Sequence, residues 1–209
     1  MFDTVLFDLD GTLINSAEGI TEGVRYALEK HHKNPIPYEE REKFIGPPIR
    51  ESFIKVCGMD AETADTLLQT YRAYYKEKGL HQCVPYDGIR ELLERLKSKG
   101  KTLLVATAKP TTFSRTILEE WKLDGFFKEI VGAGFDKNFE TKDKIVALAK
   151  SMATGKSVMV GDTIYDVFGA RANDLPIIGV MYGFGNHAEF LASKPDYIAN
   201  TVEEIERYI

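Results

Sequence analysis

Short and nearly continuous apolar runs recur along the chain, and amphipathic segments separate them over its later part. Such runs, rich in branched side chains, are typical of strands that are covered on both faces of a sheet. We expect strands at residues 4–8, 102–107, 129–133, 157–162 and 176–180.

The amphipathic segments predict helices beside these strands. In residues 87–100, Ile89, Leu92 and Leu96 fall at helical spacing, and Gly100 follows where the end of a helix favours a left-handed residue. Further segments of this kind cover residues 111–123, 141–152 and 164–174. Alternating strands and helices predict an α/β fold, with a Rossmann-like parallel sheet, right-handed crossovers and helices on both faces.

Residues 16–84 break the alternation, because they carry helical patterns and no convincing strand. The clearest pattern is a long helix from about residue 60 to residue 78. The sequence therefore predicts an α/β core made of residues 1–15 and 85–209, with a helical domain, residues 16–84, inserted after the first strand.

Composition narrows the class of partner. The chain has 209 residues, is 44% hydrophobic and carries a net charge of −5, which suits a globular protein and disfavours nucleic acid or anionic membrane as a partner. Cys57 and Cys83 have no zinc-site spacing, which indicates a reducing compartment. Without a signal-peptide pattern or a membrane-spanning apolar run, we expect a cytoplasmic protein.

Acidic side chains, a hydroxyl and lysines follow the ends of several predicted strands, where open parallel sheets bind ligands. These residues are Asp8, Asp10, Thr107, Asp162 and Asp166, with Lys142 and Lys144 at the start of a helix. Asp8 and Asp10 project to the same side of an extended segment, where two carboxylates beside a core are unfavourable without a cation. The strand-end acids predict a Mg²⁺ site, because Mg²⁺ prefers oxygen ligands and accepts a phosphate oxygen among them.

The same residue types suit phosphoryl transfer. An aspartate that attacks phosphorus forms an acyl phosphate, which divides transfer to water into two steps. A second carboxylate can protonate the leaving oxygen and later deprotonate water. Thr107 and the backbone amide of Ala108 could donate to phosphate, while a lysine neutralises charge that develops in the transition state. Asp-x-Asp alone more often caps backbone amides, so the prediction depends on all the fragments occurring together.

These fragments resemble the four motifs of the haloacid dehalogenase superfamily. DLDGT at 8–12, ATAKP at 106–110, a lysine within 141–148 and GDTIYDVFGA at 161–170 follow the order of those motifs. The resemblance implies that Asp8 is the nucleophile and a metal ligand. It also implies that Asp10 is the acid/base and that its main-chain carbonyl binds the metal.

The resemblance assigns the remaining roles as well. Thr107 and the lysine would bind phosphate, Asp162 would be a metal ligand, and Asp166 would lie behind the ligands or reach the metal through water. For the lysine we favour Lys142, because apolar residues then follow three and four positions later, as in similar phosphatases. Lys144 is the alternative.

Within the superfamily, the helical insertion resembles a cap domain, and the chain is similar to the phosphoglycolate phosphatase branch that includes 5'-nucleotidases. One departure is Ala108, where relatives often carry Asn or Ser, so a substrate contact from that side chain is missing. Lys109 follows it, and we expect it to reach the substrate from the core. Arg50, just after Gly46-Pro47-Pro48, is the candidate substrate contact in the cap.

The function that we expect is Mg²⁺-dependent hydrolysis of a small phosphomonoester, with phosphoglycolate or a nucleoside monophosphate as substrate. A sugar-phosphate mutase resembling β-phosphoglucomutase would use the same aspartyl phosphate, and a phosphate sensor without catalysis is a third possibility. The expected partner is a small phosphorylated metabolite, with no nucleic acid and no membrane. We expect a monomer or a homodimer.

Overall fold

The computed structural model describes residues 1–134 and 141–209, which form two compact units. One unit combines Met1–Asn15 with Pro85–Ile209, and the other is Ser16–Val84. In the part of the chain that is described, no helix is both long and apolar enough to cross a membrane.

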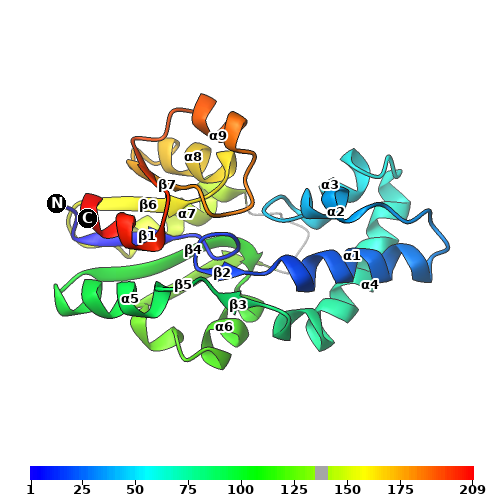
Figure 1. The fold of residues 1–209 in the computed structure, drawn as a ribbon, viewed down its shortest axis with the longest axis horizontal. Coiled ribbons are helices and arrows are strands. Elements are labelled where there is room, and N and C mark those ends of the chain that lie inside the picture. Colours follow the sequence, from blue (N-terminus) through cyan, green and yellow to red (C-terminus); the bar gives the residue numbers. More distant parts are fainter. Residues whose placement is uncertain (135–140) are drawn as a thin grey trace. The chain divides into compact units, whose positions relative to one another are not determined.

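A parallel sheet forms the centre of the first unit (Figure 1). Within the described residues it has six strands in the order β5-β4-β1-β6-β7-β8, and neighbouring strands run parallel. These strands are β1 (Thr4–Phe7), β4 (Thr102–Pro110), β5 (Glu129–Ala133), β6 (Ser157–Gly161), β7 (Ile177–Val180) and β8 (Tyr197–Ala199).

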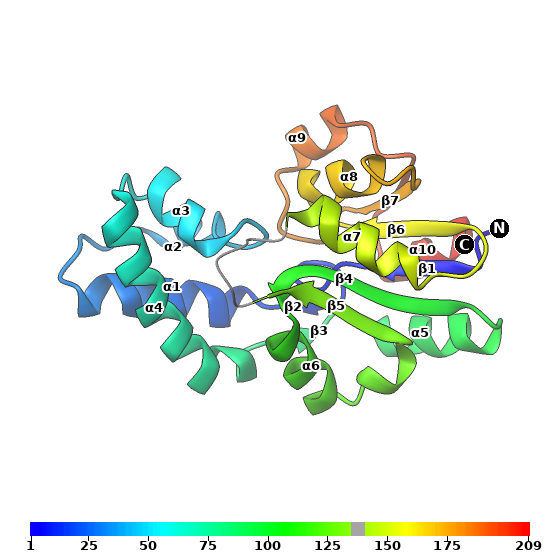
Figure 2. The same cartoon turned by 180° about the vertical axis from the view of Figure 1, so that it is seen from behind.

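Helices cover both faces of this sheet, and Figures 1 and 2 show α7, α8 and α9 on one side and α5 and α6 on the other. The helices of the unit are α5 (Ile89–Ser98), α6 (Thr111–Glu120), α7 (Lys142–Ser151), α8 (Ile164–Arg171), α9 (His187–Ala192) and α10 (Val202–Ile205), with short 3₁₀ turns at Asp124–Phe126 and Glu206–Tyr208. Ile145 of α7 and Val167 of α8 pack on Leu6 and Met159 of the sheet. The predicted α/β class, with a parallel sheet between helices, is confirmed.

Strand β1 lies at the point where the direction of winding changes. From β1 the chain proceeds to β4 and β5 on one side and then returns to add β6, β7 and β8 on the other. Every residue of β1 is buried, which fits its almost unbroken apolar sequence between two neighbouring strands. The carboxyl ends of β1, β4 and β6 therefore meet at a switch point, where open parallel sheets place ligands.

The second unit is helical and consists of α1 (Ala17–Lys30), α2 (Tyr38–Glu42), α3 (Ile49–Lys55), α4 (Ala61–Glu77) and a 3₁₀ turn at Gly79–His81. Asp60 caps α4, because its carboxylate accepts a 2.8 Å hydrogen bond from the N–H of Thr63. Tyr71 and Tyr75 are buried on α4, where their rings stack with centroids 5.4 Å apart. Where the chain passes between the units, β2 (Ile14–Asn15) and β3 (Val84–Pro85) form a two-stranded sheet.

The sequence analysis did not predict several short elements, and it placed the end of one strand too early. Strand β8 has three residues, and α9 and α10 have six and four, too few to show a clear period in the sequence. Strand β4 continues beyond residue 107 to Pro110 after a shift in its register with β5. Burial against neighbouring elements, which local pattern does not report, determines these short pieces.

Candidate active site

Asp8 follows β1 directly and is held against β6, because its N–H donates a 2.9 Å hydrogen bond to the carbonyl of Val160. The chain then turns sharply at Gly11, whose φ of +84° is readily adopted only by glycine. A Cβ on Gly11 would also lie 2.7 Å from Cγ of Asp162, so this turn brings the backbone against the acid that ends β6. Glycine thus lets the first and fourth predicted motifs approach closely.

Asp162 follows β6, and Asp166 lies in the first turn of α8. Oδ2 of Asp166 accepts hydrogen bonds from the N–H and the hydroxyl of Thr163, at 3.0 and 2.9 Å, and so caps this helix. Both acids are buried, with 2% and 0% of their surfaces exposed. The short strand-to-helix connection therefore fixes two carboxylates at one end of β6.

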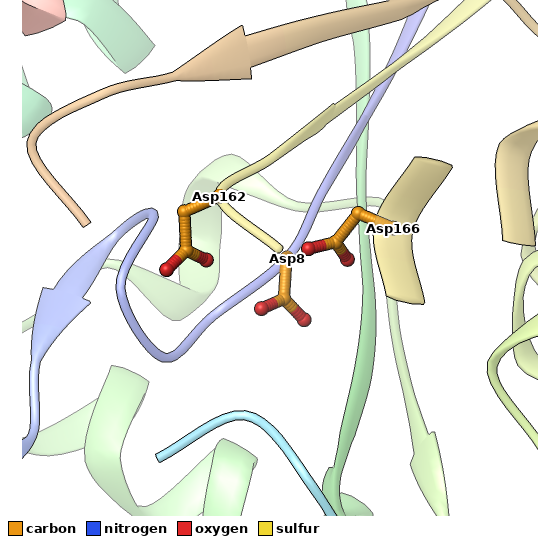
Figure 3. Close-up of side chains that lie close together, drawn as sticks. All are labelled: Asp8, Asp162 and Asp166. Carbon is orange, nitrogen blue, oxygen red and sulfur yellow. The ribbon is translucent and has the colours of Figure 1, made fainter. Parts of the chain in front are cut away.

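The carboxylates of Asp8, Asp162 and Asp166 converge at the switch point (Figure 3). One oxygen from each lies within 4.8 Å of the others. Lys142, the first residue of α7, faces two of them: its Nζ lies 2.5 Å from Oδ1 of Asp8 and 2.6 Å from Oδ1 of Asp166. Four titratable groups from three separate stretches of sequence thus share one buried space.

Burial and mutual repulsion control the protonation of this cluster. Burial, opposed by Lys142 and reinforced by the charge of Asp166, raises the pKa of Asp8 to about 7. Burial and the charges of Asp166 and Asp8 raise the pKa of Asp162 well above its ordinary value. Burial lowers the pKa of Lys142, but the attraction of Asp166 and Asp8 outweighs burial and raises it overall. The cluster therefore contains three acids and one lysine that stays protonated.

The donor set fits a hard divalent cation. Three carboxylates against one ammonium group leave two negative charges when all are ionised, and this excess favours a bound cation. Mg²⁺ binds carboxylate oxygens and retains several waters, so it does not need a closed cage of protein ligands. Asp8, Asp162 and Asp166 each offer one carboxylate oxygen that could hold such an ion.

Two further donors orient Asp162, and the sequence analysis did not identify either. The hydroxyl of Thr12 donates to Oδ1 at 3.2 Å, and the N–H of Phe184 donates to Oδ2 at 2.8 Å. Tyr182 binds the same turn from the other side, because its hydroxyl donates to the carbonyl of Thr12 at 2.8 Å. The YGFG stretch at 182–185 was the available signal, although sequence alone did not indicate which acid it contacts.

Asp10 lies in a different environment from Asp8. Its Oδ1 accepts a 2.7 Å hydrogen bond from Nζ of Lys109, and the two side chains are 11% and 5% exposed. Thr107 is also buried, and its Oγ1 accepts a 3.2 Å hydrogen bond from the N–H of Lys109. Because that bond uses an oxygen lone pair, the hydroxyl hydrogen of Thr107 remains available to donate to a ligand.

The two candidate lysines have different surroundings, and the other predicted residues lie at the end of β4 and in the helical unit. Lys142 is in the cluster, whereas Lys144 is exposed on α7. Ala108 follows Thr107 at the end of β4. Arg50 lies in the helical unit, where its Nε donates to Oδ1 of Asp65 at 2.6 Å. Its predicted contact with a substrate stays a prediction.

Comparisons with known proteins cover nearly the whole chain. A family model described as haloacid dehalogenase-like hydrolase matches residues 5–180, which include all three acids and the lysine of the cluster. The chain is 37% identical over 199 residues to a 5'-nucleotidase of Pseudomonas aeruginosa, covering 94% of this chain and 90% of that protein. It is 31% identical over 190 residues to a phosphoglycolate phosphatase of Caulobacter vibrioides, covering 87% and 79%.

A solved structure gives the same result for the fold. The crystal structure of a predicted phosphatase from Clostridium acetobutylicum matches with a TM-score of 0.93 and 44% sequence identity. The match covers 100% of this chain and 98% of that chain. The two chains therefore share the same fold over almost their whole length.

Proposed function

The chain belongs to the haloacid dehalogenase-like hydrolase family, and we propose that it is a Mg²⁺-dependent phosphatase that hydrolyses a small phosphomonoester through an aspartyl-phosphate intermediate. Two relatives support a phosphatase, because one is named a 5'-nucleotidase and another a phosphoglycolate phosphatase. The substrate, the metal and the roles of individual residues belong to the proposal.

The observation that carries the proposal is the convergence of Asp8, Asp162 and Lys142 within one buried cluster. A phosphate dianion is repelled by carboxylates, so a nucleophilic aspartate needs positive charge beside it. Lys142 supplies one such charge at 2.5 Å from Asp8. A Mg²⁺ ion held beside Asp8 would neutralise phosphate charge and so lower the repulsion between the phosphate group and the attacking carboxylate.

Asp8 and Asp10 divide the chemistry between them. A carboxylate oxygen of Asp8 attacks phosphorus, the bond from phosphorus to the leaving oxygen breaks, and Asp10 gives that oxygen a proton. Water then attacks the phosphorus of the aspartyl phosphate and gives a proton to the carboxylate of Asp10. The bond from phosphorus to the oxygen of Asp8 breaks, inorganic phosphate leaves, and both aspartates return to their starting states.

Thr107 and Lys142 bind the phosphoryl group while it moves. The free hydroxyl hydrogen of Thr107 can donate to one phosphate oxygen, and Lys142 can donate to another. Thr107 is buried and 9% of the Lys142 side chain is exposed, so these hydrogen bonds act where water screens them little. We also assign the backbone N–H of Ala108 to this group of donors, because it lies between Thr107 and Lys109 at the end of β4.

The proposed substrates are phosphoglycolate and nucleoside monophosphates. The names of two relatives support this choice, since one is a 5'-nucleotidase and another a phosphoglycolate phosphatase. Specificity in such enzymes comes from residues outside the shared motifs, and we assign it to the helical unit, residues 16–84, acting as a cap. Arg50 is the first residue there to test for a contact with a substrate carboxylate.

The proposal is tested by measuring phosphate release from a panel of phosphorylated metabolites, with and without EDTA. The panel includes phosphoglycolate, purine and pyrimidine nucleoside monophosphates, glucose 1-phosphate and p-nitrophenyl phosphate. We expect Mg²⁺-dependent turnover that Asp8→Asn lowers by on the order of 10⁵-fold, because a lost nucleophile is not replaced. Asp124→Asn, an exposed aspartate in a 3₁₀ turn, is the matched control and should leave turnover unchanged.

Two results would overturn the proposal. Turnover by a clean preparation of the Asp8→Asn variant would remove Asp8 as nucleophile. Conversion of glucose 1-phosphate to its isomer without phosphate release would show a sugar-phosphate mutase, in which the phosphoryl group returns to the sugar instead of passing to water.

A further inference from the structure

The ion pair between Lys109 and Asp10 is nearly closed to solvent. Nζ of Lys109 lies 2.7 Å from Oδ1 of Asp10, and 5% and 11% of the two side chains are exposed. A buried ammonium group is unfavourable unless a carboxylate faces it at hydrogen-bonding distance. Because the pair uses Oδ1 of Asp10, proton transfer can use Oδ2 of the same carboxylate.

A bulge in β4 brings Lys109 to this position. Thr107 pairs with Gly132 of β5, but the next pair joins Pro110 to Ala133, so three steps along β4 match one step along β5. Ala108 and Lys109 are the extra residues, and bulges of this kind redirect side chains at the ends of strands. The N–H of Lys109 donates to Oγ1 of Thr107 at 3.2 Å, which ties the bulge to the preceding residue.

Gly132 makes room for the bulge from the neighbouring strand. A Cβ at this position would lie 2.8 Å from the backbone N of Thr111 and closer still to the carbonyl oxygen of Lys109. Instead, the hydroxyl of Thr111 exchanges hydrogen bonds with Gly132, donating to its carbonyl and accepting from its N–H, each at 3.1 Å. The backbone that carries Lys109 is therefore fixed on both sides.

We propose that Lys109 is a positioning residue that acts through Asp10: its hydrogen bond to Oδ1 orients the carboxyl group of Asp10, so that a proton on Oδ2 can pass to the oxygen of the leaving group. This proposal rests on the proposed function, because it needs Asp10 as the acid/base. It replaces our expectation that Lys109 chiefly binds the substrate. The two roles differ in a measurable way, because only a group that acts on proton transfer changes how the rate depends on the leaving group.

The experiment compares kcat/KM of wild-type protein and Lys109→Met for p-nitrophenyl phosphate and for ethyl phosphate. The p-nitrophenolate group leaves without much help, whereas ethoxide needs a proton from a positioned acid. We expect kcat/KM for ethyl phosphate to fall at least about tenfold more than for p-nitrophenyl phosphate, a part of what a general acid contributes. Equal falls for both substrates would show a phosphate-binding role and overturn the proposal, as would no fall.

Three variants control this measurement. Lys97→Met removes an exposed lysine of α5 and should leave kcat/KM unchanged for both substrates. Lys109→Arg keeps a cation and should restore part of the rate on ethyl phosphate. In an Asp10→Asn background, Lys109→Met should no longer change the ratio of kcat/KM between the two substrates, because the carboxyl group through which Lys109 acts is gone.

Stability measurements separate failure of this proposal from failure of the proposed function. In urea unfolding, Lys109→Met and Asp10→Asn together should lower the midpoint by less than the sum of their separate effects, because each single change removes one of two opposite charges and leaves the other charge buried. Additive effects would overturn the ion-pair role whatever the activity. If the coupling is present but Asp8→Asn does not alter turnover, the proposed function fails and the ion pair stands.

Discussion

Asp8 and Asp10 are two residues apart, yet the fold gives them different surroundings. Asp8 lies among carboxylates from the end of β6 and the start of α8, and shares Lys142 with Asp166. Asp10 has a lysine of its own, Lys109, from the end of β4. A parallel sheet can thus give two identical side chains, close together in sequence, different surroundings by placing different strands beside them.

The proposed difference in role between Asp8 and Asp10 should be clearest when the two steps of the reaction are measured separately. In Asp10→Asn, the nucleophile remains while proton transfer is lost, so formation and hydrolysis of the aspartyl phosphate should both slow by about 10²- to 10⁴-fold. Rapid quenching of a single turnover with ³²P-labelled substrate measures each step. Asp8→Asn should form no labelled protein. Unaltered single-turnover kinetics in Asp10→Asn would remove the division of roles.

Removal of the lysine beside Asp8 should have a somewhat smaller effect on the rate. Lys142→Met removes a donor to the transferring phosphoryl group, and we expect kcat to fall by about 10²- to 10³-fold. The metal-free variant should also lose about 3 kcal/mol of unfolding free energy at pH 8, because a buried partner of two carboxylates is gone. Kinetics and urea unfolding measure the two effects.

Lys144→Met is the matched control for that variant, because Lys144 is two residues away on the same helix and exposed. It should behave as the wild type in both measurements. A larger loss in Lys144→Met than in Lys142→Met would contradict the assignment of the phosphate-binding lysine.

The smallest predicted effect is on stability as a function of pH. The pKa of Asp8 rises from 3.8 to about 7 on folding, so the folded protein binds more protons than the unfolded chain across this range. The stability from this group is fully present below pH 3.8 and is lost as pH rises through about 7. In EDTA, the melting temperature of the wild type should therefore fall between pH 5 and pH 8 more than that of Asp8→Asn.

Saturating Mg²⁺ should reverse this loss, because a bound cation favours the ionised carboxylates. We expect it to raise the melting temperature by about 5 °C at pH 8 and by less at pH 5, where protons compete with it. Scanning fluorimetry with and without MgCl₂ measures this. An equal rise at both pH values would show that the ion binds away from the acidic cluster.

Much of this arrangement could be predicted from the sequence, because strand ends are visible as apolar runs that stop at polar residues. Asp8, Thr107 and Asp162 are all found in this way, and the family and fold inferred from them are confirmed. Lys142 was preferred over Lys144 only through a family resemblance, and the structure now places Lys142 in the cluster. The roles of these residues stay predictions until the variants are measured.

The contacts that sequence reasoning missed share a physical cause. Phe184 contacts Asp162 through its backbone N–H, which every residue except proline carries. The residue type at position 184 therefore gives no signal of this contact. The pairing of Lys109 with Asp10 depends on a bulge in β4 that neither hydrophobic period nor composition encodes. Contacts that depend on irregular backbone can be found only in the structure, whereas contacts that depend on regular strands can be predicted from the sequence.

The central place of β1 has a consequence for the synthesis of the protein. Thr4 pairs with Thr102 on one side and with Ser157 on the other, so β1 is synthesised well before either of its partner strands. Such distant pairings make folding slow, because a long loop must close before each one is gained. A nascent chain that stops before residue 157 therefore contains Asp8 without Asp162, and the acidic cluster can form only after both have been synthesised.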